Sequence, residues 1–276
     1  MFSGGSLFVE SFDNKETLKC QLKGSLKEIE KYPIAGDIVS YVKDQDTFLV
    51  IDVDERKNEL KRPKVANIDY LIIVQSYVSP DINLQQLYKY IMFYNSFNIY
   101  KIIIAITKTD LVKDDNFFEK YQCLKDDSFF VYDVNNEKEY KELIKKITGK
   151  ISVFTGQSGV GKSTLLNKID SNFLIKTATI SKALNRGKHT TTSTFLYNYK
   201  GGFLIDTPGF SSINLNLSKD EISKCFEIFN NASISCKFNN CLHSIEPYCK
   251  IKELLNNGKI SKEMYSSYLE NLKKIL

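Results

Sequence analysis

The chain has 276 residues, of which 42% are hydrophobic and 26% are charged, and its formal net charge is +5. This composition is ordinary for a core-forming protein, and no apolar run has the length that a membrane-spanning helix needs. The first residues also lack the basic and apolar segments of a secretory signal. We therefore expect a cytoplasmic protein of two or three modest domains, with a mild positive charge that permits nucleic-acid binding without requiring it.

The first 65 residues predict a small β-barrel or sandwich, because they contain several short strands separated by turns. The predicted strands are Ser6–Glu10, Thr17–Leu22, Asp37–Lys43 and Thr47–Asp52. The charged stretch from Glu55 to Lys64 contains Pro63 and is typical of a linker.

From about residue 66 onwards, buried strands alternate with helices, which predicts a mostly parallel sheet covered on both faces. The predicted strands are Tyr70–Val74, Ile102–Ile106, Ile151–Thr155 and Phe203–Ile205. The predicted helices are Leu84–Phe97, Lys138–Ile147 and Lys162–Ile169.

Beyond about residue 217 the pattern becomes helical. Ser218 and Glu221 form a capping box that predicts a helix running to about Asn230. Two further helices are expected near Lys250–Asn257 and Ser261–Ile275.

Residues 156–163 match the phosphate-binding P-loop pattern completely. The stretch follows an apolar strand and opens a helix, and this context argues against a chance glycine-rich turn. Backbone N–H groups and the helix dipole attract phosphate oxygens there. We expect Lys162 to act as a catalytic residue on the β- and γ-phosphates and Ser163 to bind Mg²⁺. The predicted nucleotide-binding residues are Gly156, Gln157, Ser158, Gly159, Val160, Gly161, Lys162, Ser163 and Thr164.

Two downstream segments are candidate switch elements. The stretch Asp-Thr-Pro-Gly ends a predicted strand, and we expect Asp206 to hold Mg²⁺ through water and the Gly209 N–H to sense the γ-phosphate. The segment 186–192 contains three adjacent threonines, of which we prefer Thr191 or Thr192 as a further Mg²⁺ ligand. An exposed polar loop is the alternative for that segment.

A candidate base-reading stretch follows the strand Ile102–Ile106. It consists of Thr107, Lys108, Thr109 and Asp110, and it matches the guanine signature Asn-Lys-x-Asp except at its first position. A carboxylate at Asp110 accepts hydrogen bonds from both N1–H and N2–H₂ of guanine, which adenine does not offer. The stretch therefore predicts selectivity for GTP over ATP, with Lys108 packed along the base.

Three cysteines and a histidine cluster near the C-terminus, at Cys236, Cys241, His243 and Cys249. Thiolates and imidazole are the ligands that structural Zn²⁺ prefers, and four of them close a tetrahedral site. Buried free thiols beside a chance histidine are the alternative.

The base-reading stretch precedes the P-loop, which reverses the order found in most GTPases. This order resembles that of the RsgA/YjeQ family of circularly permuted GTPases, as do Lys57–Leu60 with Arg62–Pro63, the segment 186–192 and the cysteine cluster. The resemblance covers nearly the whole chain and implies a multidomain α/β protein. The implied domains are an RNA-binding OB-fold at 1–65, a circularly permuted GTPase domain at 66–217 and a helical zinc-binding domain at 218–276.

The resemblance also implies a function in late maturation of the small ribosomal subunit, with rRNA binding and ribosome-stimulated GTP hydrolysis. The implied cofactors are GTP or GDP with Mg²⁺ and one structural Zn²⁺. Two departures stand out. The N-terminal barrel begins unusually early, and the second base-side loop, expected near Val131–Asn136, has Tyr132-Asp133 where the family has a Ser-Ala-Lys-like stretch.

Phe210 stands where many GTPases carry a water-orienting glutamine, so intrinsic hydrolysis is expected to be slow. We expect His189 to act as a catalytic residue that orients the attacking water when the ribosome is bound. The alternative is that His189 only orders the switch loop.

Two other classes of function stay open from the sequence: an RNA-binding switch with incidental turnover, and a different P-loop enzyme such as a kinase. We expect a monomer that binds neither membrane nor DNA.

Overall fold

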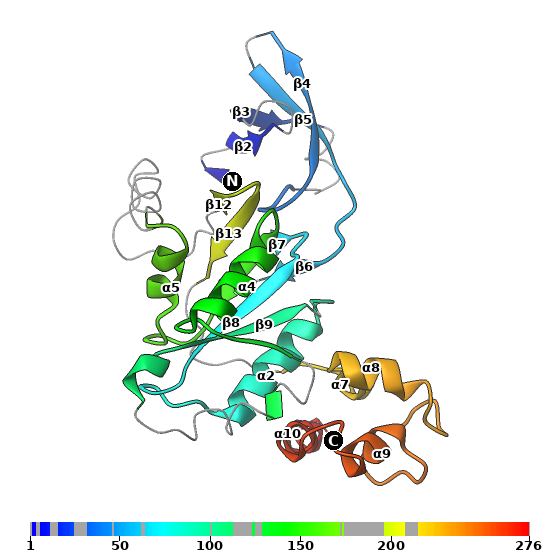
Figure 1. Cartoon of the computed structure of the whole chain (residues 1–276). Coiled ribbons are helices and arrows are strands. Elements are labelled where there is room, and N and C mark those ends of the chain that lie inside the picture. The colour runs from blue at the N-terminus through cyan, green and yellow to red at the C-terminus, as the bar shows by residue number, and fades with distance from the viewer. Residues whose placement is uncertain are drawn as a thin grey trace. The chain divides into compact units, whose positions relative to one another are not determined.

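The computed structural model describes residues 2–3, 6–11, 16–24, 32–45, 47–61, 64–99, 101–112, 123–124, 129–171, 173, 196–207 and 215–275 (Figure 1). The chain forms two compact units, each assembled from separate stretches of sequence. Unit 1 comprises Met1–Asp69, Ile147–Val153 and Leu166–Pro208. Unit 2 comprises Tyr70–Lys146, Phe154–Leu165 and Gly209–Leu276.

The N-terminal sheet has five strands in the order β1-β2-β3-β5-β4. Their bounds are β1 (Phe2–Ser3), β2 (Ser6–Glu10), β3 (Thr17–Leu22), β4 (Val39–Asp44) and β5 (Thr47–Val53). The β3–β5 pair is parallel and the other pairs are antiparallel. Alternate residues form its small core, which consists of Leu7, Cys20, Leu22 and Val50. The edge strands β1 and β4 are not paired with each other within the described residues, so a closed OB-fold barrel stays a prediction.

The expectation of a linker from Glu55 to Lys64 is wrong, because the described residues of this stretch include regular structure. Strands β6 (Glu59–Lys61) and β7 (Lys64–Ala66) form a two-stranded antiparallel sheet. Leu60 and Val65 pair in its register and are both buried. The Arg56 guanidinium also donates hydrogen bonds to both carboxylate oxygens of Asp37 at 2.8 Å. A buried apolar pair and a bidentate ion pair thus order a stretch whose composition is mostly charged.

The second sheet has six strands in the order β10-β9-β8-β11-β13-β12. Their bounds are β8 (Tyr70–Ser76), β9 (Ile102–Thr107), β10 (Phe130–Asp133), β11 (Ile151–Thr155), β12 (Leu196–Tyr199) and β13 (Gly202–Asp206). Strands β8, β9 and β10 pair in parallel, and β12 and β13 form an antiparallel pair. Four of the six strands were predicted. Strands β10 and β12, which have four residues each, were not predicted.

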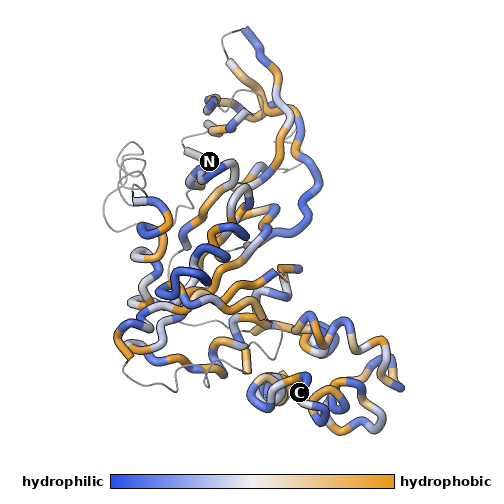
Figure 2. The backbone as a smooth tube through the Cα atoms, viewed as in Figure 1, coloured by the Kyte–Doolittle hydropathy of each residue, from blue (hydrophilic) through white to orange (hydrophobic). Residues whose placement is uncertain are grey.

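Strands β8 and β9 are buried along nearly their whole length, as their continuous apolar sequences require (Figure 2). The helices that follow the strands are α2 (Leu84–Asn95), the 3₁₀ turn η1 (Thr109–Leu111), α4 (Glu137–Ile147) and α5 (Lys162–Ile169). Because β9 and β10 are parallel neighbours, the loops after Thr107 and after Asp133 leave the same edge of the sheet. That edge carries the base-side residues.

The C-terminal segment contains four helices, coloured yellow to red in Figure 1. They are α7 (Lys219–Ser223), α8 (Glu227–Ser233), α9 (Lys250–Asn256) and α10 (Lys262–Lys273). The predicted capping box is present, with Ser218 accepting from the Glu221 N–H and the Glu221 side chain accepting from the Ser218 N–H. The prediction of a single helix running to about Asn230 was wrong. The backbone is extended at Phe226, which separates α7 from α8, and the Phe226 ring is completely buried.

Helix α10 and the turn before α8 pack on α2 within unit 2. The ring of Phe226 meets Tyr88 edge-on at a centroid distance of 6.0 Å. The buried side chain of Asn95 donates to the carbonyl of Cys225 at 2.8 Å. Helix α2 therefore connects the sheet to the C-terminal segment. Within the described part of the chain, no helix combines the length and the apolar character needed to cross a bilayer.

Candidate nucleotide and metal sites

The predicted phosphate loop connects the buried strand β11 to helix α5. The first helical hydrogen bond runs from the Leu165 N–H to the Gly161 carbonyl at 2.9 Å, so the helix begins directly after the loop. At Gly156 the backbone passes so close to β8 that a Cβ would lie 2.5 Å from the carbonyl oxygen of Val74. Glycine is therefore needed there for steric reasons. The loop residues Gly156–Thr164 lie in the strand–loop–helix context that the motif requires.

Thr107, the residue that departs from the guanine signature, is bonded to the phosphate loop. Its buried hydroxyl donates to the carbonyl of Val160 at 2.5 Å. The next residue, Gly161, has a φ of +89°, and a Cβ there would lie 3.4 Å from the Thr107 hydroxyl oxygen. The threonine hydroxyl thus supplies a donor that joins the base-reading stretch to the P-loop.

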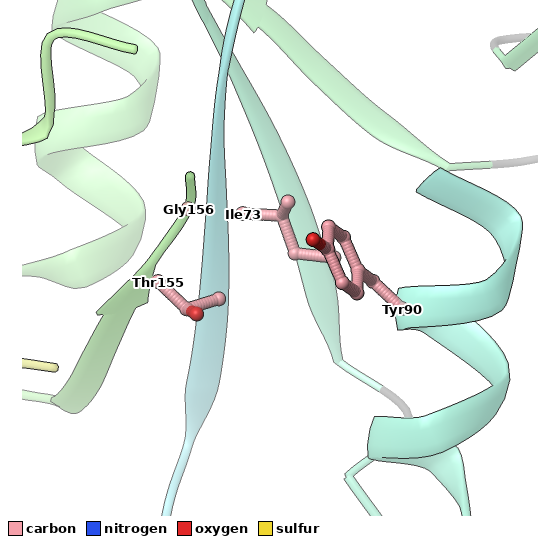
Figure 3. A pocket seen from close by; sticks show the side chains of 4 residues that line it. All are labelled: Ile73, Tyr90, Thr155 and Gly156. Atoms are coloured by element: carbon pink, nitrogen blue, oxygen red, sulfur yellow. The ribbon is translucent and has the colours of Figure 1, made fainter. Parts of the chain in front are cut away.

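Helix α2 contacts the same loop from another side. The Tyr94 hydroxyl forms a buried hydrogen bond of 2.9 Å with the Thr155 hydroxyl at the end of β11. Gln157 donates weakly to the Tyr90 hydroxyl at 3.5 Å. Figure 3 shows Tyr90 and Thr155 with Ile73 and Gly156 around a gap that is too small for a water molecule. Burial raises the pKa of Tyr94, so its hydroxyl stays protonated and keeps this bond.

The other base-reading residues lie on and before η1. Lys108 has a left-handed backbone, and its ammonium group donates to the carbonyl of Ser79. The Thr109 hydroxyl donates to the carboxylate of Asp133 at 2.9 Å. Asp110 is exposed and accepts a hydrogen bond from Asn135. Asn135 was not predicted as a site residue, because the expected loop pattern is absent there.

The structure describes only some residues of the two predicted switch elements. Asp206 is the last residue of β13, as expected for an acidic residue at a strand end. Thr191, Thr192 and Gly209 lie outside the described residues, and so does His189.

The four predicted metal ligands come together in the C-terminal segment. Their ligand atoms all lie within 4.8 Å of one another. The His243 Nδ1 atom is 3.6 Å from the Cys236 sulfur and 3.4 Å from the Cys249 sulfur. Tetrahedral zinc with bonds of about 2.3 Å to sulfur and about 2.0 Å to nitrogen separates such atoms by about 3.6 Å. The donor set and its spacing therefore fit this ion.

The histidine of this cluster is held by the backbone of α7. His243 is fully buried, and its Nε2 lies 3.1 Å from the carbonyl oxygen of Ser223. Because Nδ1 faces the sulfurs, Nε2 carries the hydrogen and donates it to this carbonyl. Burial lowers the pKa of His243 and raises that of Cys241 to about 12. The imidazole is thus ready to bind a cation, whereas the thiol must lose a proton to do so.

The loop around this cluster exposes an unusual group of side chains. Ile234, Ile245 and Tyr248 are 88%, 90% and 76% exposed. The Lys237 ammonium lies 4.6 Å from the centroid of the Tyr248 ring and 5.9 Å from that of Phe238. We call these five residues the zinc-loop patch. Apolar and aromatic side chains left this exposed on one loop are candidates for contact with a partner.

Comparison with known proteins gives consistent matches. The family model "RsgA GTPase" matches residues 53–216. A curated relative from Malacoplasma penetrans (strain HF-2), named "Small ribosomal subunit biogenesis GTPase RsgA", is 40% identical over 274 residues, which cover 98% of this chain and 96% of the relative.

Two solved structures share the fold. The structure of "YloQ, a circularly permuted GTPase" superposes with a TM-score of 0.81 at 29% identity and covers 100% of this chain and 92% of its own. The structure of "YjeQ from Thermotoga maritima" gives a TM-score of 0.79 at 29% identity, with coverage of 99% and 95%.

The bond between Thr107 and the P-loop yields a stability prediction. The variant Thr107→Val removes the donor and leaves the buried carbonyl of Val160 without it, so we expect the free energy of unfolding to fall by about 1–3 kcal/mol. Urea unfolding measures this change. The matched control is Thr47→Val, whose exposed hydroxyl also donates to a carbonyl, that of Asp44, but where water replaces the lost bond. Equal losses in the two variants would contradict the assigned contribution.

Proposed function

Because the chain belongs to the RsgA GTPase family and is a GTP hydrolase, we propose that it acts in late maturation of the small ribosomal subunit. In this proposal the subunit stimulates hydrolysis of GTP to GDP and phosphate. The observation that carries it is the full-length similarity to a relative named as a small ribosomal subunit biogenesis GTPase. The fold of a circularly permuted GTPase, shared with both solved structures over nearly the whole chain, supports it.

The nucleotide would lie between the P-loop and the base-reading stretch. The Gly156–Thr164 backbone would bind the phosphates, Lys162 would neutralise their charge, and Asp110 would read guanine. The Thr107–Val160 hydrogen bond supports this assignment, because it holds the two stretches against each other. A bound Mg²⁺ would stabilise the developing charge on the phosphates, and Ser163 would be one of its ligands.

We assign the remaining sites on sequence grounds. Asp206, Gly209 and either Thr191 or Thr192 would complete the switch region, and His189 would orient the attacking water. The proposed domains are an OB-fold at 1–65, a permuted GTPase domain at 66–217 and a zinc-binding domain at 218–276. We propose that the protein acts in the cytoplasm as a monomer.

We propose that Cys236, Cys241, His243 and Cys249 hold one structural Zn²⁺. Closure by four protein ligands leaves no open position for catalysis, which is typical of a structural site. The ligands span a segment with few helical residues between α8 and α9, so the ion would order this loop.

The proposed partner is rRNA of the small subunit, contacted in part through the zinc-loop patch. Exposed aromatic rings stack on unpaired bases, and a lysine beside them attracts phosphate. The carboxylate of Glu246, which lies in the same loop, accepts from the backbone N–H groups of Leu242 and Ser244 at 2.9 and 2.8 Å. Its negative charge is therefore partly compensated, and the patch stays favourable for a polyanion.

The decisive test of the function is phosphate release from GTP and from ATP, with and without purified small ribosomal subunits. We expect slow release from GTP alone and stimulation of at least about tenfold by the subunit, since docking would supply the missing water orientation. The variant Lys162→Ala should lose this activity. A preference for ATP, or no response to the subunit, would contradict the proposal.

Zinc binding is tested by metal analysis of the purified protein after dialysis. We expect one zinc per chain in the parent protein and loss of this zinc in Cys249→Ala, because three remaining ligands no longer close the site. The matched control is Cys225→Ala, since Cys225 is a buried thiol of the same segment outside the cluster. Equal zinc loss in both variants would indicate unfolding of the segment rather than loss of a ligand.

The RNA contact is tested with the double variant Phe238→Ala/Tyr248→Ala. Loss of stacking typically costs about 1–3 kcal/mol per base, so we expect weaker subunit binding with unchanged GTP hydrolysis in the absence of subunits. The matched control is Phe130→Ala, which removes another exposed ring with a lysine 3.8 Å from its centroid. Subunit affinity that stays at the parent value in the double variant would exclude the patch from the interface.

A further inference from the structure

We propose that Asn135 is a positioning residue for guanine recognition, which acts by holding the carboxylate of Asp110 in its reading orientation. This inference rests on the proposed GTP site and assigns a residue to it that the signature motifs do not include. In this proposal Asn135 touches Asp110 and not the base itself. It therefore contributes to the specificity of base recognition and not to the hydrolysis step.

The sheet register brings the two residues together. In the parallel pair of β9 and β10, Tyr132 lies opposite Ala105 and Asp133 lies opposite Ile106. The Val134 N–H continues this pairing by donating to the Ile106 carbonyl at 2.9 Å. The loop with Asn135 therefore leaves the sheet beside the loop with Asp110.

Two side-chain hydrogen bonds then join the loops. The Asn135 Nδ2 atom donates to Asp110 Oδ1 at 2.5 Å. In the opposite direction along the sheet edge, the Thr109 hydroxyl donates to Asp133 Oδ1 at 2.9 Å. Each loop thus donates one hydrogen bond to the other: Asn135 donates to Asp110, and Thr109 donates to Asp133.

Asn135 is itself held in place by its own loop. Its backbone N–H donates to Asp133 Oδ1 at 2.8 Å, and the Asp133 N–H donates to Glu139 Oε2 at 2.6 Å. Because Glu139 belongs to α4, the loop is anchored to a regular element. The amide that meets Asp110 is therefore positioned by the backbone and by a helix, although the side chain is exposed.

The hydrogen bond to Asp110 leaves its capacity for guanine intact. A carboxylate accepts about four hydrogen bonds, and Asn135 uses one site on Oδ1. Within the described residues Oδ2 accepts no hydrogen bond. An exposed aspartate otherwise rotates among several side-chain conformations, and fixing one of them removes an entropic cost from binding.

The loop lacks the Ser-Ala-Lys-like residue types expected there. It nevertheless places an amide donor, that of Asn135, against the base-reading carboxylate. Asparagine is suited to this position because its amide nitrogen only donates and so meets a carboxylate with one fixed polarity.

The test compares the affinities of Asn135→Ala and the parent protein for GDP, IDP and ADP by titration calorimetry. Inosine lacks the exocyclic amine, so it makes one of the two hydrogen bonds that guanine makes to Asp110. We expect GDP to bind about tenfold more weakly to the variant and IDP to lose less, so that the ratio of the two affinities falls. The nearly isosteric Asn135→Asp should lower GDP affinity further, because two carboxylates then face each other.

The matched control is Asn136→Ala. Its side chain accepts from the N–H groups of Lys138 and Glu139 at 3.1 and 3.2 Å, so this variant weakens the start of α4 and leaves the bond to Asp110 in place. We expect its ratio of GDP to IDP affinity to match that of the parent. In an Asp110→Ala background, Asn135→Ala should cause no further loss of GDP affinity.

The outcomes separate the two levels of the proposal. An unchanged ratio in Asn135→Ala, or a loss in the Asp110→Ala background equal to that in the parent, would overturn the positioning assignment. A parent protein that binds ADP as tightly as GDP would instead overturn the proposed base site itself.

Discussion

The hydrogen bond from the Thr107 hydroxyl to the Val160 carbonyl joins two stretches that lie 53 residues apart in the sequence. The first stretch ends strand β9 and carries the candidate base-reading residues. The second forms the candidate phosphate loop. Permutation changes the order in which the chain makes these stretches, but a sheet positions them by strand pairing and not by chain order. The contact depends on backbone and hydroxyl groups, so threonine in place of asparagine still joins the two stretches.

Helix α2 extends this arrangement to the metal cluster. Tyr94 and Tyr90 contact the strand and the loop that precede α5. Asn95 and Tyr88 of the same helix contact the turn at Cys225 and Phe226. Two residues before that turn, the Ser223 carbonyl accepts from the imidazole of the metal cluster. A continuous series of packed and hydrogen-bonded groups therefore runs within one compact unit from the phosphate loop to the candidate zinc ligands.

The sequence was most informative where one physical requirement dominates a stretch. Helix α5 was predicted with its observed bounds, because the P-loop pattern determines where it begins. Strand β10 was missed because it is short and its first residue is exposed, which leaves too few residues to reveal a period. The β6–β7 pair was missed because charge was taken to indicate a linker, although Leu60 and Val65 pair in its register and are both buried. A capping box marks where a helix begins and carries no information on its end, so the break before Phe226 could not be predicted locally.

The candidate sites also divide into residues that the sequence reveals and residues that only the folded structure reveals. Residues that need a particular chemistry, such as the cysteines and Lys162, are visible in the sequence, whereas Asn135 is selected only by what it meets across the sheet edge. The zinc-loop patch combines both cases. A flexible loop could collapse and bury these exposed rings and aliphatic groups, whereas four ligands held around one ion would limit such a collapse. The ion that orders the loop would thus also determine that the patch faces solvent and is available to a partner.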